Sequence, residues 1–218
     1  MIENELPHML PAPTFDEIER MPLENRTPVM GLLFAPPFTK TGKEMLIPRL
    51  GYLDERSGRH IHFFCAGYGG YRFAEDQQHI TDMRYDNGVV IPWGFSDRKY
   101  AQFVDELEQH TSWKMRGEAE LILVGGNLDF RDTLVFDVEA MVADGAIRSA
   151  GRLFEAVISF AKALGDRATP ASISDRKGLS LLGDAAATAI LELVPNAARE
   201  LWTRGRYYAT RDLHKRVA

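Results

Sequence analysis

Cysteine is nearly absent from this sequence: Cys65 is the single one among 218 residues, so no disulfide bond can form within the chain. Long apolar runs are absent too. Runs such as 32–35 and 121–124 are of strand length and far below the roughly 18 residues of a membrane-spanning helix. The N-terminus lacks the basic and apolar segments of a secretory signal. We therefore expect a soluble, cytoplasmic protein that does not bind a membrane.

Complete catalytic and nucleotide-binding motifs are also missing. There is no G-x-S-x-G, no P-loop, no H-E-x-x-H and no EF-hand loop. Gly67, Gly69 and Gly70 have the spacing G-x-G-G, and no apolar helical pattern follows them, so they do not match a dinucleotide-binding fingerprint. The formal net charge of −5 argues against general nucleic-acid binding. The sequence therefore lacks the best-known enzyme signatures. It does not exclude an enzyme whose catalytic residues follow no standard motif.

Charge is distributed unevenly between the two ends of the chain. Residues 1–30 carry six acidic and two basic residues, whereas residues 199–218 carry six basic and two acidic residues. An acidic, proline-rich arm and a basic tail can each contact a surface of opposite charge. We expect an irregular N-terminal arm over 1–27, with one helical turn near 15–21, and a single domain over 28–218.

The first part of this domain, residues 28–142, has the pattern of a sheet-rich segment. The sequence DNG at 86–88, between two runs of alternating apolar residues, is the strongest hairpin signal in the chain. A second hairpin is expected around the turn 55–58. The predicted strands cover 28–36, 45–54, 59–67, 80–85, 89–95, 117–126, 133–142 and 205–213.

The second part, residues 146–204, has the pattern of a helix-rich segment. Ser96 and Ser174 each precede the sequence Asp-Arg-Lys and an apolar periodic run, which is typical of a helix N-cap. Since the strands and helices do not alternate, we predict an α+β fold. Its mainly antiparallel, or mixed, sheet is built from hairpins and is covered on one face by three longer helices, at 96–110, 146–164 and 174–194.

The stretch around Cys65 contains two candidate chemistries. Strand alternation places Cys65 among apolar residues and on the face opposite His62, which indicates a buried thiol. The alternative is a nucleophilic cysteine activated by a distant histidine. Gly69 and Gly70 are expected to form a bend, and Arg72 beside them is a candidate for binding an anion. These last three are the predicted ligand-binding residues.

The strands 117–126 and 133–142 each carry acidic residues on one face. A symmetric hairpin would place Glu120 opposite Glu139, with Asp137 nearby. Like charges across strands destabilise a sheet unless a cation lies between them, and carboxylates are ligands that Mg²⁺ prefers. These three acids are therefore the candidate catalytic residues of a Mg²⁺-dependent enzyme. The other interpretation is a solvated strand face with no metal and no cofactor.

The C-terminal segment mixes basic and aromatic residues. Such a mixture can bind single-stranded nucleic acid through phosphate contacts and base stacking. We favour the interpretation that these side chains pack against the core or against a protein partner. The residues that would contact nucleic acid are Arg204, Arg206, Tyr207, Tyr208 and Arg211.

Two functions remain from the sequence. A non-catalytic module that binds a protein, as a component of a multi-protein or homo-oligomeric assembly, is favoured by the missing catalytic motifs and the oppositely charged ends. The alternative is a metal-dependent enzyme acting on a phosphorylated or nucleotide substrate, in which Arg72 meets the phosphate and the acidic strand pair holds the ion.

Overall fold

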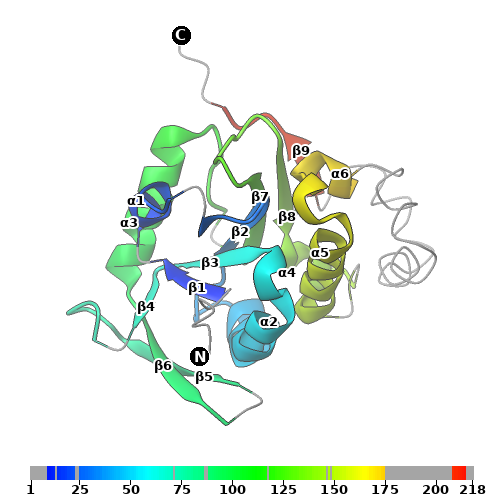
Figure 1. Cartoon of the computed structure of the whole chain (residues 1–218). Helices are drawn as coiled ribbons and strands as arrows, with labels where there is room; N and C mark the ends of the chain where they lie inside the picture. The colour runs from blue at the N-terminus through cyan, green and yellow to red at the C-terminus, as the bar shows by residue number, and fades with distance from the viewer. Residues whose placement is uncertain are drawn as a thin grey trace.

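Two sheets and the helices around them make up the computed structural model of the chain in Figure 1. The larger sheet has six strands in the order β1-β3-β2-β7-β8-β9, and the smaller has three in the order β4-β6-β5. The structure describes residues 9–12, 14–22, 25–70, 72–85, 88–116, 118–145, 147, 149–174 and 208–214.

Strand pairing in the larger sheet is mixed. β1 and β2 each pair in parallel with β3, which lies between them, and the remaining pairings, from β2 through β7 and β8 to β9, are antiparallel. Every residue of β2 and β3 is buried, so both faces of the sheet are covered at its centre. The strands are β1 (Met9–Ala12), β2 (Val29–Phe34), β3 (His62–Ala66), β7 (Glu120–Gly125), β8 (Thr133–Asp137) and β9 (Tyr208–Arg211).

The smaller sheet follows β3 directly and contains the hairpin predicted around DNG. Its strands are β4 (Tyr68–Gly70), β5 (His79–Arg84) and β6 (Val90–Phe95), and β6 pairs antiparallel with both neighbours. The chain turns from β3 into β4 at Gly67, whose φ is 77°. A Cβ atom there would also lie 2.6 Å from the Cβ of Tyr100, so this turn requires glycine.

Two of the predicted helices are present where the sequence places them. α3 (Asp97–His110) begins at the predicted cap, where the Lys99 backbone N–H donates to the Ser96 hydroxyl at 3.1 Å. α5 (Ala150–Leu164) ends at Gly165, whose φ is 53°. The predicted helix 174–194 lies outside the described part of the chain apart from Ser174. The predicted N-cap at Ser174 is wrong, because Ser174 is itself a helical residue of α6 (Pro170–Ser174), whereas an N-cap residue has an extended backbone.

The helices cover both faces of the larger sheet, not one face as expected (Figure 1). Side chains from alternate positions of β2, β3 and β7 point to opposite sides. On one side Leu33, Phe63 and Leu121 share a core with α5 and with the helical segment made of η2 (Thr41–Leu46), η3 (Ile47–Arg49) and α2 (Leu50–Ser57). On the other side Phe34, Phe64 and Ile122 share a core with α3 and α1 (Phe15–Glu19).

The predicted hairpin of 45–54 with 59–67 is wrong. Residues 41–57 are helical, and β3 pairs with β1 and β2 rather than with the segment before it. Leu46, Leu50 and Leu53 are buried at helical spacing, which explains the helix. The strand predicted over 133–142 also ends early, because Asp137 caps α4 (Val138–Ala143) by accepting from the Ala140 backbone N–H at 2.9 Å.

The predicted class, an α+β fold with mainly antiparallel pairing, is confirmed. Part of the predicted N-terminal arm belongs to the folded body: β1 joins the sheet, and Phe15 and Ile18 of α1 are fully buried. Short helical turns complete the described elements, at η4 (Gly58–His60), η5 (Gly165–Arg167) and α6 (Pro170–Ser174). In the part of the chain that the structure describes, no helix has the length and apolarity to cross a membrane.

Candidate functional site

The predicted acidic pair forms in a different register from the expected one. Glu120 lies opposite Asp137, two residues from the expected partner Glu139, which belongs to α4. The loop between β7 and β8 determines this register. Residues that a symmetric hairpin would have paired across the two strands belong instead to the turns of this loop. Gly126 donates to the Pro28 carbonyl, and Leu128 donates to the Gly125 carbonyl, both at 2.8 Å.

The Glu120 carboxyl is buried and is bound by a neighbouring side chain of the same chain. Its side chain accepts a hydrogen bond from the Trp113 indole N–H at 3.0 Å, and its other oxygen is buried and makes no hydrogen bond within the described residues. Burial raises the pKa of Glu120, while the Trp113 hydrogen bond and the charge of Arg116 oppose this shift. A carboxyl that is 1% exposed and bound by Trp113 is not presented to a substrate.

Asp137 is occupied on both oxygens. One accepts from the Ala140 backbone N–H, and the other accepts from the Arg116 guanidinium at 3.2 Å. Over the described ranges, no three histidine, cysteine or acidic residues are grouped so that they could hold a metal ion. Glu120, Asp137 and Glu139 therefore lie near one another in the fold, but their carboxylates are not grouped so that a metal ion could bind to all three.

The bend formed by Gly69 and Gly70 after β3 allows a close packing contact with Phe73. The Phe73 ring lies against Gly69 where any side chain would collide with it, and the Phe73 N–H donates to the Gly70 carbonyl at 3.1 Å. Arg72 lies in the turn between them with a φ of 62°. Cys65 is buried in the core as predicted, and burial raises the pKa of its thiol far above the usual range. The Cys65 thiol is therefore enclosed in the core.

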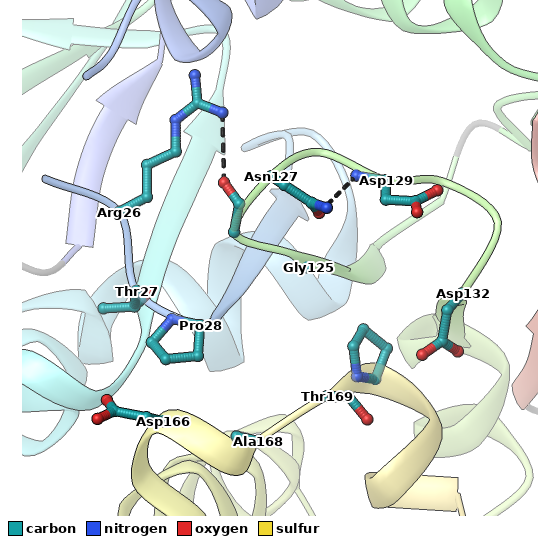
Figure 2. A pocket seen from close by; sticks show the side chains of 12 residues that line it. Arg26, Thr27, Pro28, Gly125, Asn127, Asp129, Asp132, Asp166, Ala168 and Thr169 are labelled. Carbon is teal, nitrogen blue, oxygen red and sulfur yellow. Dashed lines mark hydrogen bonds between the residues drawn. The ribbon is translucent and has the colours of Figure 1, made fainter. Parts of the chain in front are cut away.

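A cavity of about 500 Å³ lies between the β7–β8 loop and the start of α6 (Figure 2). Its polar lining includes Arg26, Asp129 and Asp132, and each has a partner in the chain. Arg26 donates to the carbonyl oxygens of Ile18, Glu19, Met21 and Gly126. Asp129 binds Arg131, which lowers the pKa of Asp129 to about 2. Asp132 accepts from a backbone N–H of α6. These polar groups stabilise loops.

The β5–β6 hairpin carries an unusual surface that the sequence analysis did not single out. Ile80, Val89, Val90 and Ile91 are 56%, 48%, 44% and 42% exposed. Among the described residues, every exposed large aliphatic side chain lies on this hairpin. The signal that could have revealed it is the run of three aliphatic residues directly after DNG, at a turn where polar residues are usual.

The hairpin projects from the body beside α2 and is anchored there by its inner face (Figure 1). Met83, Trp93 and Phe95 point inward and belong to the core that also contains Leu50 and Leu53. Gly51 of α2 packs directly against the Arg84 backbone carbonyl, where any larger residue would collide. The exposed aliphatic side chains are thus held on a firmly attached support.

The comparisons with known proteins add no assignment to this picture. No family model matches the chain, and neither a curated protein nor a solved structure matches it significantly.

Proposed function

We propose that this protein is a non-catalytic module that binds another protein through the exposed aliphatic side chains of the β5–β6 hairpin. The observation that supports the proposal is the concentration of exposed aliphatic side chains on this one element. Exposed apolar residues are ordinary when they are scattered, whereas a contiguous patch on the order of a few hundred Å² marks an interaction surface.

The hairpin does not need these side chains in order to fold. Its inward residues supply the packing against α2 and η3, and its strands are paired along their whole length. Ile91 pairs with Met83 and lies on the inward side, near the hairpin tip, where it is exposed. Ile80 and Val90 point to the opposite side, where polar residues are usual in a sheet with one solvated face. Their apolar character therefore has an explanation in binding and none in the packing of the body.

This proposal places the protein in an assembly, either multi-protein or homo-oligomeric, in the cytoplasm. The opposite charges of the two chain ends support the same function, since they offer additional contacts to a partner. A Mg²⁺-dependent enzyme is the weaker proposal, because Glu120 is enclosed beside Trp113 and Asp137 is bound by Arg116.

Site-specific photo-crosslinking tests the proposal. A photoreactive amino acid is placed at position 80 or position 90, and the cells that produce the protein naturally are irradiated. A matched control carries it at position 118, where Glu118 is also exposed but belongs to neither strand of the hairpin. We expect protein adducts from the two hairpin positions and not from the control. Hairpin positions that form no protein adduct would contradict the proposal.

A further inference from the structure

We draw no further inference here: the strongest candidate, the patch of exposed aliphatic side chains on the β5–β6 hairpin, belongs to the site already described, and nothing in the described part of the structure shows what covers it.

Discussion

Replacing Glu120 by glutamine is predicted to stabilise the folded protein at neutral and alkaline pH. The wild-type carboxylate is 1% exposed and receives one side-chain hydrogen bond, from Trp113, although an ionised carboxylate can accept about four. A glutamine of nearly the same shape keeps an oxygen to accept from Trp113, and its amide nitrogen takes the place of the oxygen without a partner, so that only the buried charge is removed. Since an unsatisfied buried polar group costs about 1–3 kcal/mol, and a charged one more, we expect a gain of about 1–2 kcal/mol at pH 8.

The gain should depend on pH in a defined direction. Burial raises the pKa of Glu120 in the folded protein above the ordinary value of 4.5. Between these two pKa values the folded state binds more protons than the unfolded state, so the contribution of Glu120 to stability falls as pH rises. Below the ordinary value both states are protonated and the penalty disappears. The difference between Glu120→Gln and wild type should therefore be near zero at pH 4 and grow toward pH 8.

Urea unfolding of both proteins at several pH values from 4 to 8 measures this difference. The comparison with wild type at each pH is essential, because carboxyls with a lowered pKa, such as Asp129, lose their stabilising effect as pH falls. Glu118→Gln is the matched control, since Glu118 is exposed and its change should stay within about 0.5 kcal/mol. A Glu120→Gln variant that is less stable than wild type at pH 8, or a difference that does not vary with pH, refutes the reasoning.

Three further predictions concern the packing around the candidate sites. Cys65 should react with a thiol reagent at pH 8 roughly 100-fold more slowly in the native protein than in urea, because burial raises the pKa of its thiol and blocks access; equal rates would contradict this. Gly51→Ala should destabilise the protein by about 3 kcal/mol in urea unfolding, since the added methyl meets the Arg84 backbone, which cannot move as a flexible side chain can. Arg26→Ala should cost about 2 kcal/mol by removing the donors to four carbonyls, and a neutral result in thermal unfolding would show that water replaces them.

Local signals were sufficient for the features that depend on nearby residues. The hairpin around DNG, the cap at Ser96 and the stop at Gly165 each arise from a turn or cap whose partners lie within a few positions. The burial of Cys65 also followed from strand alternation, because the residues at 61 and 63 share its side of the sheet and belong to the same core.

Long-range features were not predictable in the same way. The segment 45–54 has an apolar run that suits a strand or a helix, and contacts with α5 and β5 decide for the helix. The parallel pairing of β1 with β3 joins residues more than fifty positions apart. The acidic pair was expected in the wrong register because the loop before β8 folds on its own side chains: Asn127 accepts from the Asp129 N–H, and Thr133 donates to the Phe130 carbonyl.

Side chains alternate between the two faces of the β5–β6 hairpin, so different residues serve its attachment to the body and its proposed binding of a partner. Inward residues such as Trp93 are 4% exposed and attach the hairpin to the body, whereas Ile80 on the outward face is 56% exposed and contributes little to that attachment. A substitution at an inward position changes stability and binding together, so it cannot distinguish between them. A substitution at an outward position changes only what a partner would contact. For this reason the outward aliphatic positions, Ile80 and Val90, test the proposed function more sharply than any residue of the core.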